Sequence, residues 1–108
     1  MPTYNKLVRD RIPEIIESNG KKFRTRILSE EEYITELKNK SFEELEEYRD
    51  AETREEALEE LADLMEIVHA FAKSHGTTLE EVEEIRLKKA EKRGAFDEKI
   101  FLIDVEDE

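Results

Sequence analysis

The chain is predicted to fold as an all-α bundle of about four helices, with a minor two-stranded β ribbon. Three observations favour this class: apolar residues recur at helical spacing, hydroxyl residues mark helix starts, and glycines mark helix ends. Charged residues make up 44% of the sequence and hydrophobic residues 37%. We therefore expect one domain, residues 1–108, whose helices have densely charged outer faces.

Three long helices are predicted at about 30–50, 54–75 and 79–93. Each begins with a capping-box pattern, in which a hydroxyl accepts from the amide three residues later and a glutamate reaches back. The three pairs are Ser29/Glu32, Thr53/Glu56 and Thr78/Glu81. Gly76 and Gly94 are expected to end the last two helices. A shorter helix, at about 13–19, is predicted from Pro13 to Asn19-Gly20.

Two segments have strand-like sequences. Residues 23–28 partly alternate polar and apolar side chains, and residues 99–105 form a β-branched and aromatic run. An isolated two-stranded ribbon is only marginally stable in water. We therefore expect the two segments to pair and to lie on the helices.

The distribution of charge limits the class of ligand. The formal net charge is −12, and residues 29–84 carry twenty Asp/Glu against five Lys/Arg, whereas residues 1–28 carry three against seven. No continuous basic stripe is available to bind a nucleic acid polymer. The absence of cysteine excludes thiolate metal sites. With no long apolar run or signal-peptide pattern, we expect a cytoplasmic protein that does not enter the membrane.

Two pairs of carboxylates carry the strongest chemical signal. Glu44 and Glu47 lie three residues apart in one predicted helix, and Glu60 and Asp63 lie three apart in the next. This spacing places each pair on one helix face. Both pairs fall on one shoulder of the apolar stripe of their helix. These stripes are Ile34, Leu37, Leu45 and Tyr48 in the first helix, and Leu61, Leu64, Met65, Val68, Phe71 and Ala72 in the second.

If the two helices pack antiparallel, the two pairs can face each other. Four clustered carboxylates repel one another unless a cation lies between them, and hard oxygen ligands suit Mg²⁺, or alternatively Mn²⁺. The competing interpretation is that such pairs arise by chance in glutamate-rich helices and are solvated. Lys6, Arg9, Lys89 and Arg93 are weaker candidates for contacts with phosphate, the alternative for each being a solvated charge.

A third pattern points to a different metal. Glu66 and His69 form an E-x-x-H unit, which is found in di-iron helical bundles. On a helical wheel, however, both residues project away from Glu60 and Asp63. The sequence contains no P-loop, no GxGxxG loop and no Ser/His/Asp arrangement.

The opening segment 4–16, Tyr-Asn-Lys-Leu-Val-Arg-Asp-Arg-Ile-Pro-Glu-Ile-Ile, resembles a subgroup of the MazG-like, all-α nucleotide pyrophosphohydrolases, often labelled phosphoribosyl-ATP pyrophosphohydrolase-like. The metal motif of that superfamily, E-x-x-E followed by E-x-x-D, matches Glu44-x-x-Glu47 and Glu60-x-x-Asp63. The closing segment 92–96, Lys-Arg-Gly-Ala-Phe, is also similar, with Ala95 where a second glycine is usual. The resemblance covers almost the whole chain.

The resemblance implies Mg²⁺-dependent hydrolysis of the α–β phosphoanhydride of a nucleoside triphosphate, giving a nucleoside monophosphate and pyrophosphate. It also implies house-cleaning of non-standard nucleotides and assembly into a homodimer or a larger homo-oligomer. The hypothesis assigns Glu44, Glu47, Glu60 and Asp63 to the metal, and Glu47 also to the attacking water. The alternative function is a non-catalytic acidic helical dimer that binds a nucleotide or a protein partner.

Overall fold

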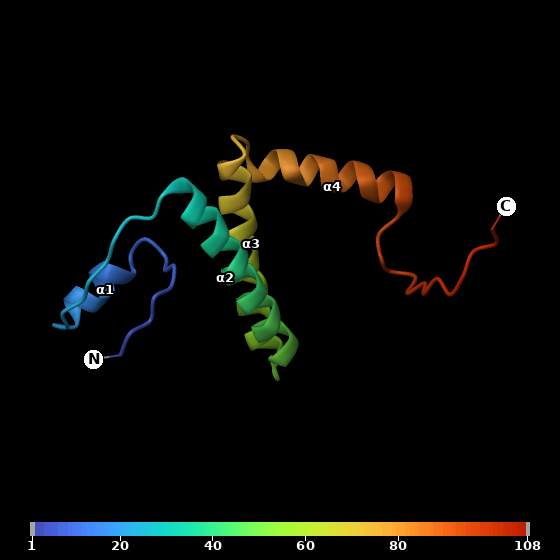
Figure 1. The fold of residues 1–108 in the computed structure, drawn as a ribbon. Helices are drawn as coiled ribbons and strands as arrows, with labels where there is room; N and C mark the ends of the chain where they lie inside the picture. Colours follow the sequence, from blue (N-terminus) through green and yellow to red (C-terminus); the bar gives the residue numbers. More distant parts are fainter. Residues whose placement is uncertain (1, 108) are drawn as a thin grey trace.

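Four helices form the structure, a computed structural model that describes residues 2–107. They are α1 (Ile12–Ser18), α2 (Glu30–Asp50), α3 (Arg54–Ser74) and α4 (Leu79–Arg93). Helices α2 and α3 form a central antiparallel hairpin, with α1 on one side of it and α4 leaving the far end of α3 (Figure 1). None of the described helices has both the length and the apolar character needed to cross a membrane. The predicted all-α fold with about four helices is confirmed.

The hydroxyl caps lie where the sequence predicts them. Ser29 and Glu32 form the full capping box: the Ser29 Oγ accepts from the Glu32 amide and a Glu32 carboxylate oxygen accepts from the Ser29 amide, both at 3.2 Å. Thr53 and Thr78 also accept from the amides three residues later. The reciprocal half of these two boxes was wrongly predicted. The carboxylates of Glu56 and Glu81 instead accept from groups one residue before the cap, the Glu52 amide and the Thr77 hydroxyl.

A glycine turn ends α3 and sets the direction of α4. Gly76 has φ +72°, a left-handed conformation that costs glycine little. Its amide donates to the Lys73 carbonyl at 2.9 Å, and the Thr77 amide donates to the Ala72 carbonyl at 3.1 Å. These two bonds make a Schellman motif. Gly76 therefore ends this helix as predicted, and the chain turns so that α4 leads away from the hairpin (Figure 1).

The predicted β ribbon is wrong. Residues 23–28 and 99–105 contain no strand, and they lie at opposite ends of the molecule, one beside α1 and the other beyond α4 (Figure 1). The physical reason is distance: α4 carries the second segment away from the first, so no ladder of hydrogen bonds can form between them. The strand-like composition of each segment could not by itself supply a partner.

The core is small and lies between α2 and α3. Only Leu37, Ile67 and Ala72 are buried apolar residues within the described chain. Ile67 was not part of the predicted apolar stripe of its helix, whereas Met65, which was, is 60% exposed. The reason is that α3 is rotated about its own axis, relative to the orientation that would turn the predicted stripe toward α2. The side facing α2 includes Ile67 and, seven residues earlier, Glu60, so Leu61, Met65 and Val68 of the predicted stripe lie on the flank of the contact, while Ala72 is buried as predicted.

The molecule is extended for its length. Its radius of gyration is 18.7 Å, whereas a compact chain of this size would have about 13 Å. Helix α4 contains no buried residue and packs only against α3 among the described helices. Much apolar surface therefore remains exposed outside the central hairpin.

Leu37→Ala is expected to lower the free energy of unfolding by about 2–4 kcal/mol, because it opens a cavity in a core of three residues. Urea unfolding followed by circular dichroism measures the change. Leu87→Ala serves as the control, since Leu87 is 54% exposed on α4, and should cost less than about 0.5 kcal/mol. Equal losses in the two variants would contradict the placement of the core.

Candidate metal centre

Three carboxylates meet at the interface of the two central helices. Glu44 and Glu47 lie one turn apart on α2, and Glu60 lies across from them on α3. One oxygen from each residue lies within 4.8 Å of the others. Glu44 lies seven residues after the buried Leu37 on α2, and Glu60 lies seven residues before the buried Ile67 on α3. Seven residues are two helical turns, so each glutamate lies on the same face of its helix as the buried apolar residue. Glu44 and Glu60 therefore continue the line of the core rather than lying on its shoulder, whereas Glu47 is exposed.

Burial makes this arrangement costly without a cation. Glu44 is only 8% exposed, and it is the only buried charged residue in the described chain. Its Oε2 atom and the Oε2 atom of Glu60 are buried and have no hydrogen-bond partner. A buried carboxylate oxygen without a partner is strongly disfavoured. A divalent cation would satisfy both oxygens at once, so the residues present fit a metal ion.

The electrostatics of the cluster favour proton uptake when no cation is present. Burial raises the pKa of Glu44, and the nearby carboxylates of Glu47 and Asp63 add to this effect. The facing carboxylate of Glu44, then that of Glu47, together with loss of solvation, raises the pKa of Glu60 to about 7. Because one shared proton relieves the repulsion between facing carboxylates, a divalent cation that binds here competes with protonation of the cluster.

The fourth predicted carboxylate has a different partner. Asp63 lies one turn beyond Glu60 on α3, and its Oδ1 accepts from a guanidinium nitrogen of Arg9 at 2.7 Å. Both side chains are about half exposed, so the ion pair contributes less than about 1 kcal/mol. Within residues 2–107, no other side-chain hydrogen bond joins residues more than six positions apart. Arg9 thus holds the N-terminal segment at the edge of the carboxylate cluster.

The other basic candidates are not gathered at the cluster. Lys6 lies over the Tyr4 ring, with its Nζ atom 5.9 Å from the ring centroid, and is exposed. Lys89 and Arg93 are exposed on α4, which leads away from the hairpin (Figure 1). A single chain therefore brings only Arg9 of the four predicted basic residues to the carboxylates.

The E-x-x-H unit does not join the carboxylate cluster. Glu66 is exposed and His69 is half-buried on α3. Within the described part of the chain, the one group of three or more potential metal ligands consists of glutamates alone. An all-oxygen set suits a hard cation such as Mg²⁺ or Mn²⁺ better than it suits a site with histidine ligands.

The spacing of the ligand atoms is close to what a small divalent cation needs. The three oxygens lie within 4.8 Å of one another, so small rotations of the side chains would allow one small divalent cation to contact all three. The exposed Glu47 leaves the site open on one side, where a phosphate could approach.

Comparison with known proteins gives one relative. The chain is 51% identical over 53 residues to an uncharacterized protein of Mycolicibacterium smegmatis. The matched residues are 49% of this chain and 54% of the relative, so the chain spans about half of the length of the protein that it matches. No family model matches the chain, and no solved structure matches it. The family resemblance thus stays a prediction.

Without a divalent cation, the chain is expected to become more stable as the pH is lowered from about 8 to about 5.5. The pKa of Glu60 is about 7 in the folded chain and has its ordinary, lower value in the unfolded chain. Between these values the folded state binds more protons, so its stability falls as the pH rises. Thermal melting in EDTA at fixed ionic strength measures this trend.

The matched control separates this effect from the general repulsion in an acidic protein. Glu60→Gln should reduce the pH dependence, whereas Glu59→Gln, an exposed neighbour with the same change of charge, should retain it. Equal slopes in the two variants would show that Glu60 has no raised pKa.

Proposed function

We propose that the chain is a Mg²⁺-dependent nucleoside triphosphate pyrophosphohydrolase, which cleaves the α–β phosphoanhydride. The observation that carries this proposal is the buried, unpartnered carboxylate of Glu44 facing Glu60 across the α2–α3 interface. A cluster of this kind supports binding of a divalent cation, and Mg²⁺ commonly binds through carboxylates together with substrate phosphates. The motif resemblance described above supports the choice of reaction.

Each carboxylate has a role consistent with its position. Glu44 and Glu60 would hold the cation from opposite helices, and Asp63 would join them once released by Arg9. Glu47 is the most exposed of the cluster, so it would orient the attacking water and accept its proton. When bound, the cation would offset the negative charge of the carboxylates and of the phosphate oxygens.

The reaction needs no covalent intermediate on the protein. The water oxygen forms one new bond to phosphorus as the bridging P–O bond breaks, and the water proton passes to Glu47. The products are a nucleoside monophosphate and pyrophosphate. The absence of cysteine and of a Ser/His/Asp arrangement is therefore compatible with this chemistry.

Arg9 is the proposed phosphate ligand of the chain itself. Its guanidinium already reaches the edge of the cluster, at 2.7 Å from Asp63. A triphosphate would offer it a more highly charged, bidentate partner. Lys6, three residues before it, would follow the same segment. Lys89 and Arg93 would reach the phosphates only from another copy of the chain, in keeping with the proposed homo-oligomer.

One observation favours a second candidate function, in which the chain binds a nucleotide without hydrolysing it. Three of the four basic candidates lie away from the carboxylates in a single chain. Such a protein would be stabilised by Mg²⁺ and nucleotide without forming product.

The biological role proposed for the enzyme, removal of non-standard triphosphates in the cytoplasm, depends on the family resemblance.

Glu44→Gln and Glu60→Gln should each lower Mg²⁺-dependent release of pyrophosphate by at least about 100-fold, because each removes a charged ligand. The same variants should raise the melting temperature of the metal-free protein, because each removes repulsion at the interface. This opposite pair of effects distinguishes loss of the site from loss of the fold. Phosphate detection after a coupled pyrophosphatase, across a panel of ordinary and modified triphosphates, measures turnover.

Glu43→Gln and Glu59→Gln are the matched controls, since both residues are exposed neighbours of the cluster and carry the same charge. Both should keep the activity and the stabilisation by Mg²⁺. Stabilisation by Mg²⁺ and a nucleotide in the unmodified chain, with no product from any triphosphate, would assign the binding function instead. Unchanged turnover in Glu60→Gln would remove Glu60 from the proposed site.

Arg9→Gln should weaken nucleotide binding about tenfold, as expected for loss of one charge-assisted contact, while leaving binding of Mg²⁺ alone equal or tighter. The reason is that Arg9 occupies Asp63 in the free chain. Isothermal titration with Mg²⁺, and then with nucleotide at saturating Mg²⁺, separates the two effects. Arg11→Gln, at a nearby exposed arginine, is the control. Weaker binding of Mg²⁺ in Arg9→Gln would contradict the assignment.

A further inference from the structure

An apolar segment follows α4, and no other part of residues 2–107 covers it. We name residues 95–105, which follow α4, the C-terminal arm. The arm exposes large apolar side chains over most of their surface: Phe96 (97%), Ile100 (81%), Phe101 (87%), Leu102 (72%), Ile103 (85%) and Val105 (72%). Contiguous apolar surface of this kind marks a site of interaction in soluble proteins.

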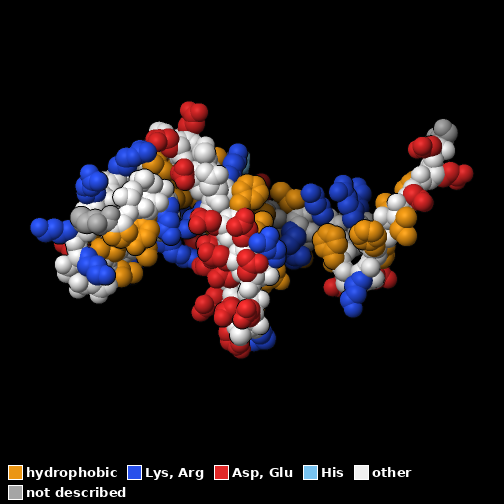
Figure 2. All heavy atoms as spheres, turned by 60° about the horizontal axis from the view of Figure 1, so that its bottom comes forward, with side chains coloured by type: hydrophobic (Ala, Val, Ile, Leu, Met, Phe, Trp, Pro, Cys, Tyr) orange, Lys and Arg blue, Asp and Glu red, His pale blue; other side chains and the backbone are white. Residues whose placement is uncertain are grey.

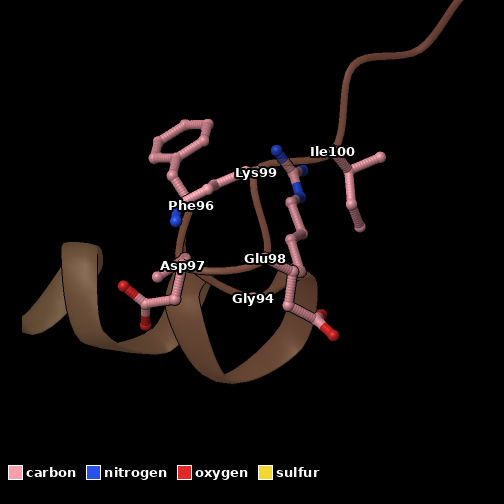
Figure 3. A pocket seen from close by; sticks show the side chains of 8 residues that line it. Gly94, Phe96, Asp97, Glu98, Lys99 and Ile100 are labelled. Carbon is pink, nitrogen blue, oxygen red and sulfur yellow. The ribbon is translucent and has the colours of Figure 1, made fainter.

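The local conformation of the arm does not bury these side chains. A shallow pocket of about 360 Å³ is lined by the consecutive residues 93–100. Figure 3 shows Phe96 and Ile100 pointing away from each other on opposite sides of this loop. The loop therefore presents its apolar groups outward and does not form a small core of its own.

A second exposed apolar surface runs along α3. Leu58, Leu61, Met65 and Val68 recur at steps of three and four, which places them on one helix face. We name these four residues the α3 stripe. Their exposed fractions range from 38% at Val68 to 60% at Met65. The side of α3 that faces α2 passes through Glu60 and Ile67, so α2 does not cover the α3 stripe. Met65 borders a pocket with Leu79 and Glu83 of α4, but it stays 60% exposed.

The end of α4 that precedes the arm and the two central helices carry opposite charges. Residues 86–93, which lead into the C-terminal arm, carry five Lys/Arg against one Asp/Glu. Helices α2 and α3 together carry fifteen Asp/Glu against five Lys/Arg. Figure 2 shows acidic side chains gathered over the central helices, and basic ones along the part of the molecule that leads to the apolar arm. Complementary charge of this kind steers one surface onto another.

A single chain keeps these complementary surfaces apart. The Schellman turn at Gly76 directs α4 away from the hairpin, and the resulting molecule extends over 64 Å along its longest axis. We propose that a second copy of this chain is the partner: the C-terminal arm of one copy lies on the α3 stripe of another. The basic end of α4 then lies beside the acidic face of the neighbouring copy.

The absence of cysteine allows a direct test. Met65→Cys and Ile103→Cys are introduced in separate full-length chains, which are mixed, oxidised and run on a non-reducing gel. The proposal expects a disulfide-linked pair of the two different chains. Glu66→Cys replaces Met65→Cys as the matched control, since Glu66 is the exposed residue next to the α3 stripe, and should cross-link to Ile103→Cys at least tenfold less.

Light scattering on the unmodified chain should show an oligomer, and Phe101→Glu with Ile103→Glu should convert it to a monomer with an unchanged helical spectrum. Both residues are exposed in the arm, so these changes do not affect the core. A monomer at 100 μM before any substitution would overturn the proposal. A disulfide within one chain of the double variant Met65→Cys/Ile103→Cys would also overturn it. So would cross-linking only between two Met65→Cys chains.

Discussion

The opposition of Glu44 and Glu60 is the constraint on which the rest of the structure depends. Both residues lie on the lines along which α2 and α3 contact each other, one step of seven residues from Leu37 and from Ile67. One part of the interface between the two helices is therefore apolar and stabilising, while another part is charged and repulsive without a cation. Few buried apolar residues hold the hairpin, so a cation at the acidic end would strengthen the same contact that creates its site.

The local features of the fold could be predicted because their causes are local. Ser29, Thr53 and Thr78 begin the long helices by accepting from nearby amides, and glycine at position 76 ends α3 by its backbone freedom. The orientation of α3 about its axis could not be predicted in the same way, because apolar residues lie on several faces of this helix and only packing decides which face meets α2. Ile67 was missed for this reason.

The candidate site was partly accessible to sequence reasoning. Motif spacing brought Glu44, Glu47 and Glu60 to attention, and the structure brings them together. Spacing could not show that Glu44 would be buried, nor that Arg9 would reach Asp63 from a segment more than fifty residues away. The strand prediction for residues 99–105 failed because β propensity reflects a partner surface, which this chain does not provide.

The turn at Gly76 has a mechanical consequence. The direction of α4 is set by two backbone hydrogen bonds at that turn, and the helix has no buried side chain to hold it there. Changes in a few backbone dihedral angles at this turn can change the direction of α4 without opening the core. A partner that binds the far end of α4 would therefore influence the angle between α4 and α3 more strongly than the hairpin does.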